Sequence, residues 1–401
     1  MKYRSLYSVV LSTTLLLTPF ASLHAGLLLG KYDREHMTTH TGSPQGDRTT
    51  SGPWLMTYYV GYQNSYLKPR DVDYSLMTHI VVGGVGVNAD GSLNEHWHLT
   101  EGDGREMARE VGARADRERV KKLVWLGGPN EESKLYAATS DQVRPTTVRN
   151  ILALVRALDY DGVDIDWEPI RRQDEARVLA LVRDLRAAES DLLITIPVNW
   201  VPTTILATKD LSIYPKLARY VDRLFIMSYS MAGPWPGWRS WYSGALTGDT
   251  LSTPGSVRTS VRAYERAGVP NGMLGVGIGT YATCWEYPVR EPNQAIPSTF
   301  ALADVHTMSM RTLMDGYYVR KYERWDSRAE VPYLTLPVPM GDLHCGFISY
   351  ENERSVEEKV TYTHTHGLGG ILVWNIGTGY YPDAGYGERH PLLKAASDAL
   401  E

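Results

Sequence analysis

Residues 161–168 read Asp-Gly-Val-Asp-Ile-Asp-Trp-Glu, and no other stretch of the chain says as much about its structure. Asp164, Asp166 and Glu168 alternate here with apolar residues. A period of two is typical of a β-strand, because successive side chains of a strand point to opposite faces. The stretch therefore predicts a strand with three carboxyl groups on one face and a packed apolar surface on the other.

This crowding of acids points to acid–base chemistry. Neighbouring carboxylates repel one another, which raises their pKa values and keeps a proton on some of them near neutral pH. A protonated carboxyl is what glycoside hydrolysis needs to protonate the leaving-group oxygen. The spacing alone also fits a solvated acidic strand edge or a site for a hard cation. The apolar opposite face disfavours the first, and the lack of an Asp-rich loop with a Gly turn or a nearby His cluster disfavours the second. We therefore expect no metal and no organic cofactor.

From about residue 54 onward, strand-like and helical patterns alternate. The predicted strands are Met56–Gly61, His79–Gly84, Lys122–Leu126, Gly162–Trp167, Leu192–Pro197, Arg223–Met227, Leu274–Gly279 and Gly370–Trp374. Helical spacing is found, for example, in Val148–Leu158, Ala176–Ala187 and Val356–Thr365. Eight strands separated by helices predict an α/β fold, a (β/α)8 TIM barrel, whose site lies in the loops after the strands. A doubly wound open sheet is the alternative, but no Gly-x-Gly-x-x-Gly turn follows the first strand.

The 401 residues divide into segments of different composition. Residues 1–25 are typical of a secretory signal peptide, because basic residues precede a short apolar run. Residues 26–53 show no periodicity, and we expect them to form an irregular leader. Residues 54–401 are expected to form the barrel domain. Within it, residues 285–346 are too long for a simple crossover and predict a small α+β insertion between strands 7 and 8.

Charge and cysteine content fit an exported protein. Loss of Lys2 and Arg4 with the signal would change the formal charge from −5 to about −7. This mildly acidic balance gives no reason to expect nucleic acid as a partner, and we expect no membrane association after cleavage. A monomer secreted to the extracellular space or the periplasm is expected. The two cysteines, Cys284 and Cys345, are either a disulfide or two buried thiols.

The acidic stretch resembles the Asp-x-x-Asp-x-Asp-x-Glu motif of glycoside hydrolase family 18, the chitinases and their relatives. The similarity runs from about Tyr59 to the end of the barrel. Other segments that resemble family motifs are Trp125-Leu-Gly-Gly128, with Trp in place of the usual Ser, Met227-Ser-Tyr229, Gly277-Ile-Gly-Thr-Tyr281, Trp325-Asp326, Val331-Pro-Tyr333, Phe347-Ile-Ser-Tyr350 with Ser355 and Lys359, and Gly369–Trp374.

The resemblance implies a substrate-assisted retaining mechanism. The 2-acetamido oxygen of the substrate would attack the anomeric carbon and form an oxazolinium ion. Glu168 would protonate the glycosidic oxygen and then act as base toward water. Asp166 would hold the acetamido N–H, and Asp164 would share a proton with Asp166. Tyr229 would donate a hydrogen bond to the acetamido oxygen. Asp161 is expected to support the start of the strand.

Aromatic side chains are the expected sugar contacts. Trp374 would form the floor of the −1 sugar site. Trp235, Trp238 and Trp241 lie in a loop with Gly and Pro, where exposed indoles suit the apolar faces of sugar rings. Weaker candidates are Tyr62 and Trp285, and Met227 and Tyr281 complete the expected substrate-binding set.

One departure concerns the residue after Tyr229. Family members have Asp or Asn at this position, whereas this chain has Ser230, which supplies no negative charge. The leading hypothesis is a secreted hydrolase of β-1,4-N-acetylglucosamine linkages, with chitin or N-acetylglucosamine-containing oligosaccharides as its partner. The alternatives are an endo-β-N-acetylglucosaminidase acting on N-glycans or peptidoglycan, and a weakly active or inactive chitin-binding lectin. The presence of Glu168 favours the hydrolase hypothesis, whereas Ser230 leaves the lectin alternative open.

Overall fold

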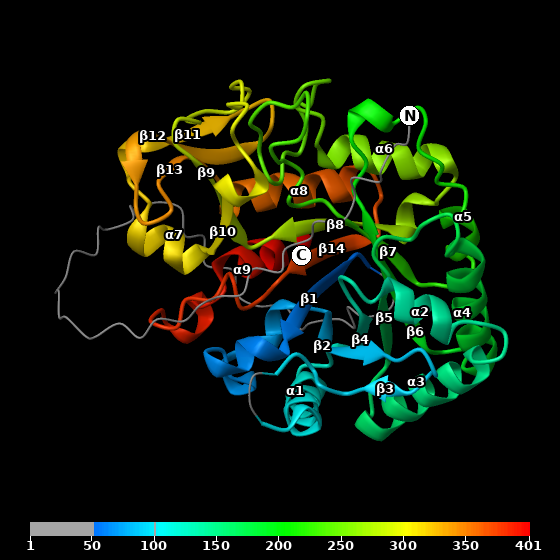
Figure 1. Ribbon diagram of the computed structural model, residues 1–401. Coiled ribbons are helices and arrows are strands. Elements are labelled where there is room, and N and C mark those ends of the chain that lie inside the picture. The colour runs from blue at the N-terminus through cyan, green and yellow to red at the C-terminus, as the bar shows by residue number, and fades with distance from the viewer. Residues whose placement is uncertain (1–51, 100–101) are drawn as a thin grey trace. The chain divides into compact units, whose positions relative to one another are not determined.

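A closed barrel of parallel strands forms the centre of the computed structural model, which describes residues 52–99 and 102–401 (Figure 1). Its strands are β1 (Trp54–Val60), β2 (His79–Val87), β4 (Lys121–Gly127), β5 (Gly162–Asp166), β6 (Leu193–Asn199), β7 (Arg223–Met227), β8 (Leu274–Gly279) and β14 (Gly370–Trp374). Each pairs in parallel with the next, and β14 pairs with β1, which closes the ring. The TIM barrel is confirmed. The predicted signal peptide and nearly all of the leader lie outside the described residues.

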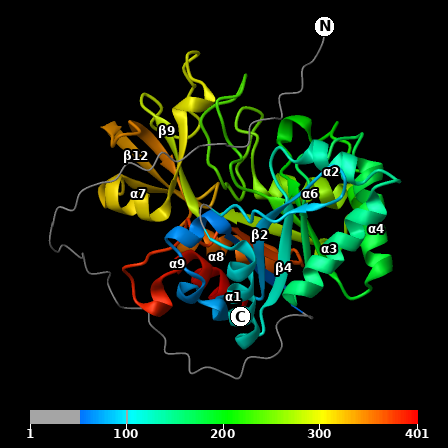
Figure 2. The ribbon, with the colours of Figure 1, turned by 60° about the horizontal axis from the view of Figure 1, so that its bottom comes forward.

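Helices follow most strands and surround the ring (Figure 2). They are α1 (Gly104–Arg117), α2 (Glu132–Ala138), α3 (Arg144–Leu158), α4 (Glu175–Ala188), α5 (Tyr214–Leu217), α6 (Val257–Ala267), α8 (Glu353–Thr365) and α9 (Pro391–Leu400). Local sequence explains several boundaries. The Asp103 side chain accepts hydrogen bonds from two backbone N–H groups at the start of α1, and the Ser256 side chain accepts one from the Thr259 N–H at the start of α6. None of the described helices combines the length and the apolar composition that a membrane span requires.

The insertion between the seventh and eighth barrel strands is a second, antiparallel sheet, yellow to orange in Figure 1. Its order is β10-β9-β13-β12-β11, built from β9 (Tyr281–Glu286), β10 (Val305–Ser309), β11 (Glu323–Asp326), β12 (Val331–Met340) and β13 (Cys345–Ser349), with helix α7 (Met310–Gly316). The sheet begins at Tyr281, directly after β8, and so extends beyond the expected range of 285–346 on both sides. Cys284 and Cys345 form a disulfide between β9 and β13, which settles the alternative that the sequence left open.

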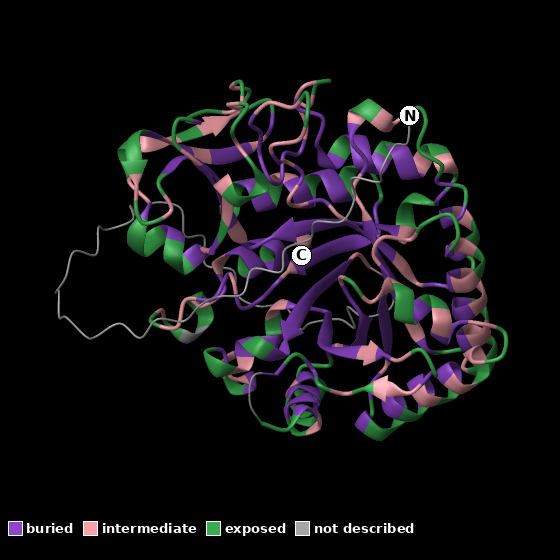
Figure 3. Cartoon of the chain, viewed as in Figure 1, coloured by how far each residue is buried: buried purple, intermediate pink, exposed green. Residues whose placement is uncertain are grey.

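The barrel strands are buried on both faces (Figure 3). One face of β1 and β4 contributes Tyr58 and Trp125 to an apolar cluster inside the ring. Val163 and Ile165 of β5 belong instead to the large core that also includes the helices. Asp164 must point inward, because the Tyr58 hydroxyl bonds to it. The alternation expected for residues 161–168 is therefore present, with acids inside and aliphatic side chains outside.

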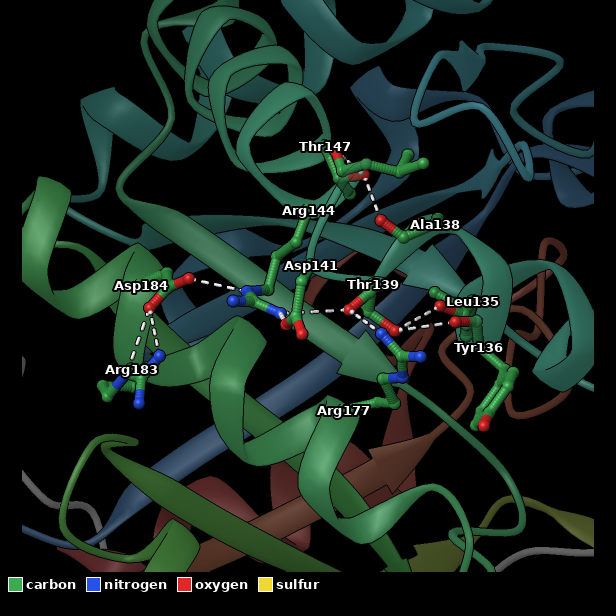
Figure 4. A network of polar contacts seen from close by, with 11 residues as sticks. Leu135, Tyr136, Ala138, Thr139, Asp141, Arg144, Thr147, Arg177, Arg183 and Asp184 are labelled. Carbon is green, nitrogen blue, oxygen red and sulfur yellow. Dashed lines mark hydrogen bonds and ion pairs between the residues drawn. The ribbon is translucent and has the colours of Figure 1, made fainter.

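Arginine side chains tie the outer helices together beyond the end of α2 (Figure 4). Arg144 of α3 and Arg177 of α4 both donate to the carbonyl oxygen of Thr139, which follows α2. Arg144 also pairs with Asp141 and with Asp184 of α4. A helix leaves its last carbonyl groups without intrahelical partners, so these cations supply the missing donors. The network fixes α2, whose preceding loop lies beside the acidic strand.

Candidate active site

Asp164 lies fully buried near the carboxyl end of β5. The Tyr58 hydroxyl, from β1, donates to its Oδ2 at 2.7 Å. The Thr195 hydroxyl, from β6, donates to its Oδ1. Burial raises the pKa of Asp164 to about 7, although both hydrogen bonds act in the opposite direction. Asp164 can therefore hold or release a proton near neutral pH.

Asp166 is the next inward residue of the strand and is 5% exposed. Trp125 donates its indole Nε1–H to Oδ2 at 3.0 Å. The other oxygen, Oδ1, is buried and accepts no hydrogen bond from the described residues. Burial raises the pKa of Asp166 well above its usual range, and the nearby Glu168 and Asp164 charges raise it further. Oδ1 is therefore available to accept a hydrogen bond from a group that enters the site.

Glu168 lies just beyond β5 and is partly exposed, so its carboxyl can meet a ligand. Burial raises its pKa to about 7. The interaction with Asp166 lowers this pKa, whereas the charges of Asp164 and Glu132 raise it. Glu132 begins α2 and was not singled out in the sequence. Near neutral pH, a substantial fraction of Glu168 is thus an acid that can donate a proton.

The end of β7 and the loop after it bring Met227, Tyr229 and Ser230 to this end of the barrel. Met227 ends the strand, and burial raises the pKa of Tyr229 well above its usual range, so its hydroxyl stays protonated and can donate. Ser230 has a left-handed backbone (φ 51°), and its N–H donates to Ser243 Oγ at 2.9 Å. The Ser230 hydroxyl shares a 2.5 Å hydrogen bond with the hydroxyl of Tyr281. Ser230, the residue that departs from the family motif, is therefore hydrogen-bonded to Tyr281.

Trp374 is the last residue of β14 and is partly exposed. Its indole meets the ring of Tyr58 edge to face, with centroids 5.0 Å apart, and that of Trp125 at 5.7 Å. These neighbours hold Trp374 at the carboxyl end of the barrel, the end at which Glu168 and Tyr229 also lie. Tyr62, 41% exposed, lies in the short turn after β1 and so reaches the same end.

The tryptophan-rich loop divides into two kinds of residue. Trp235 and Trp238 are partly exposed and contact each other at 4.6 Å between ring centroids. Trp200, which directly follows β6, contacts both of them at 6.2 and 6.1 Å. Trp241 is only 1% exposed and donates its indole N–H to the Gly255 carbonyl. We call Trp200, Trp235 and Trp238 the indole cluster.

Two of the aromatic side chains considered as sugar contacts are buried and cannot stack on a sugar ring. Trp241 and Trp285 belong to the apolar core under the insertion sheet, and Trp285 is fully buried. Their burial follows from packing between the β7 loop and the antiparallel sheet. Asp161, as expected, supports the start of β5, because it accepts from Lys121 Nζ at 2.8 Å and from the Lys122 backbone N–H.

The structure brings the expected catalytic residues together, since every one of them lies at or just beyond the carboxyl end of a parallel strand. Sequence reasoning missed Tyr58, Thr195 and Trp200. Thr195 gave a usable signal, because it is a polar residue inside an otherwise apolar strand. Trp200 gave another, because an aromatic residue directly after a barrel strand lies at the rim.

Residues 55–379 match the sequence model of Glycosyl hydrolases family 18, and the chain belongs to this family. It is 28% identical over 353 residues to a probable endochitinase of Caenorhabditis elegans, covering 81% of this chain and 55% of that protein. It is 23% identical over 360 residues to an endochitinase of Manduca sexta, covering 81% of this chain and 62% of that protein. The chain thus spans little more than half of the length of these two relatives.

Solved structures share the fold. The Group IV chitinase of Ostrinia furnacalis in complex with allosamidin superimposes with a TM-score of 0.72 at 24% identity, covering 87% of this chain and 98% of that one. A family 18 chitinase of Cycas revoluta in complex with (GlcNAc)3 gives a TM-score of 0.70 at 21% identity, covering 87% and 100%.

Proposed function

We propose that this chain is a secreted glycoside hydrolase that cleaves β-1,4 linkages between N-acetylglucosamine units, as in chitin. One observation carries the proposal: Asp164, Asp166 and Glu168 stand in one row, and burial raises the pKa of Asp164 and of Glu168 to about 7. Glycosidic cleavage needs a carboxyl that is protonated at working pH and can later act as a base.

The mechanism begins with proton transfer from Glu168 to the glycosidic oxygen. The 2-acetamido oxygen of the −1 sugar attacks the anomeric carbon as the bond to the leaving sugar breaks, giving an oxazolinium ion. Asp166 accepts the acetamido N–H and offsets the positive charge of this ion. Glu168, now a carboxylate, takes a proton from water as the water attacks the anomeric carbon. Two inversions leave the product with the configuration of the substrate.

Neighbouring side chains orient the sugar. Tyr229 keeps its proton and donates to the acetamido oxygen, while Trp374 stacks on the pyranose ring. Met227 and Tyr281 line the same site, and Tyr62 lies at its rim. Trp235 and Trp238, together with Trp200, receive the flat faces of further sugars.

Relatives support the substrate class. The two curated proteins named above are called endochitinases, and the two solved structures contain allosamidin and (GlcNAc)3. Secretion rests on the composition of residues 1–25. A monomer remains our expectation, and the molar mass measured by light scattering would check it.

Glu168→Gln tests the proposal, because the amide is nearly isosteric but cannot donate the proton. We expect hydrolysis of chitin tetrasaccharide to fall by at least about 1000-fold, while the Kd for the same oligosaccharide changes less than about threefold. Hydrolysis at the wild-type rate by this variant would refute the role of Glu168. The lectin alternative, which Ser230 leaves open, requires that the wild-type protein binds the tetrasaccharide without cleaving it.

A further inference from the structure

Trp125 occupies an unusual place for a large side chain. It belongs to β4 and points into the barrel, where it is 4% exposed. Its only polar atom, Nε1, donates to Oδ2 of Asp166 at 3.0 Å. The family motif that the Trp125-Leu-Gly-Gly128 segment resembles usually has a serine at this position. In this chain, the indole therefore contributes a hydrogen bond to the acidic row.

The surroundings of Trp125 are shaped to hold its ring. A Cβ atom on Gly84 would lie 3.1 Å from its Cδ2, and a Cβ atom on Gly128 would lie 3.1 Å from its Cζ2. Such distances are tighter than ordinary van der Waals contact, so glycine makes room for the indole at both positions. The rings of Tyr58 and Trp374 meet Trp125 edge to face at 6.0 and 5.7 Å. Packing on these sides leaves the indole no room to turn.

The two oxygens of Asp166 consequently differ. Oδ2 is satisfied by the fixed indole, whereas Oδ1 is buried and has no partner in the described part of the chain. The charge of Glu168 raises the pKa of Asp166, so the two carboxyl groups are electrostatic neighbours. Asp164 already accepts two hydroxyl groups, those of Tyr58 and Thr195, so Asp166 is not needed as its donor.

We propose that Trp125 is a positioning residue: its indole N–H holds Asp166 turned toward Glu168 and leaves Oδ1 free for the acetamido N–H of the substrate. This inference rests on the proposed function. A carboxyl group that is oriented in advance loses less freedom when the substrate binds, and it already lies where the positive charge of the oxazolinium ion develops. The donor also lowers the pKa of Asp166, against the effect of burial.

Trp125→Phe removes the N–H and keeps an aromatic ring. We expect kcat on chitin tetrasaccharide to fall about 10- to 100-fold, the range for one hydrogen bond to a charged group, with KM changed less than about threefold. The acidic limb of the pH profile should move to higher pH, because Asp166 loses a donor that favours its charged form. A purely structural role would not move the pH profile.

Trp241→Phe is the matched control. It removes an equally buried indole N–H, but one that donates to a backbone carbonyl under the insertion sheet. We expect the wild-type pH profile for this variant. A wild-type kcat and pH profile in folded Trp125→Phe would overturn the inference.

A second measurement does not depend on activity and so separates this inference from the proposed function. In protein labelled with 15N-tryptophan, the indole Nε1–H resonance of Trp125 is the one absent from the spectrum of Trp125→Phe. We expect it to shift with pH as Asp166 ionises, and to lose this titration in Asp166→Asn, which keeps Trp125 in place. If the titration is unchanged in Asp166→Asn, Trp125 does not hold Asp166, whether or not the wild-type protein cleaves chitin.

Discussion

The hydroxyl of Tyr58 on β1 donates to Oδ2 of Asp164 on β5, at 2.7 Å and across the interior of the barrel. The two residues are 106 positions apart in sequence, and the closure of the barrel brings them together. With Thr195 on the other oxygen, Asp164 is held from two strands. The innermost acid of the row is therefore fixed by the fold.

Tyr58→Phe removes one of these donors. The hydrogen bond from Tyr58 lowers the pKa of Asp164, so its loss should raise that pKa. We expect kcat to fall about 10-fold and the acidic limb of the pH profile to move to higher pH. Tyr59→Phe is the matched control, because the Tyr59 hydroxyl donates to the Leu67 carbonyl in the core outside the ring. Equal profiles for the two variants would contradict the role of Tyr58.

Asp164→Asn should change how stability depends on pH. Burial raises the pKa of folded Asp164 to about 7, whereas an unfolded Asp titrates near about 4. Between these values the folded state binds more protons, so the free energy of unfolding falls as pH rises. The free energy of unfolding of Asp164→Asn, measured relative to that of wild type, should therefore rise by on the order of 2–4 kcal/mol from pH 4 to pH 8.

Urea unfolding of both proteins at the two pH values checks this expectation. Asp161→Asn serves as control, since its carboxyl pairs with Lys121 at the opposite end of the strand. If the difference in the free energy of unfolding between wild type and Asp164→Asn is the same at both pH values, Asp164 is not protonated in the folded state.

Ser230→Asp tests the position at which this chain departs from its family. The new carboxylate would lie beside the Tyr281 hydroxyl, which now bonds to Ser230. An added negative charge at the site should raise the pKa of Glu168 further, so the alkaline limb of the kcat/KM profile should move to higher pH. Ser230→Asn adds the same bulk without charge and should leave that limb in place. If Ser230→Asp keeps the wild-type profile, position 230 is not part of the active site.

The indole cluster should contribute to binding more than to chemistry. Trp235→Ala removes one of three indoles that contact one another. We expect KM for chitin tetrasaccharide to rise about 10-fold with kcat changed less than about threefold, as for the loss of one stacking contact. Leu251→Ala, in the same long loop and 73% exposed, should have no effect. A fall in kcat with an unchanged KM would contradict a role in sugar binding.

Local patterns in the sequence were enough to predict much of this structure. The acids of β5 could be placed on one face because a strand alternates its side chains, and the eight barrel strands could be located because each is a short apolar run between turns. The long-range contacts could not be predicted. Nothing near Asp164 in the sequence indicates that Tyr58 or Thr195 would bond to it.

The sequence also did not show which tryptophans are exposed and which are buried. Trp235 and Trp241 lie in one loop of similar composition, yet Trp235 is partly exposed and Trp241 is buried against the insertion sheet. The difference arises because Trp241 belongs to a buried cluster with Trp285, Val331 and Phe347 of the insertion sheet. The sequence of a loop does not show which of its residues the insertion sheet will bury.

The stereochemistry of the first product tests the central claim most directly. Chitin tetrasaccharide is incubated with the protein, and the anomers of the released sugars are resolved by NMR within the first turnovers, before they equilibrate. We expect the newly formed reducing end to be the β-anomer, because the acetamido group and then water each invert the anomeric carbon. Release of the α-anomer would contradict retention and with it the roles given to Asp166 and Glu168.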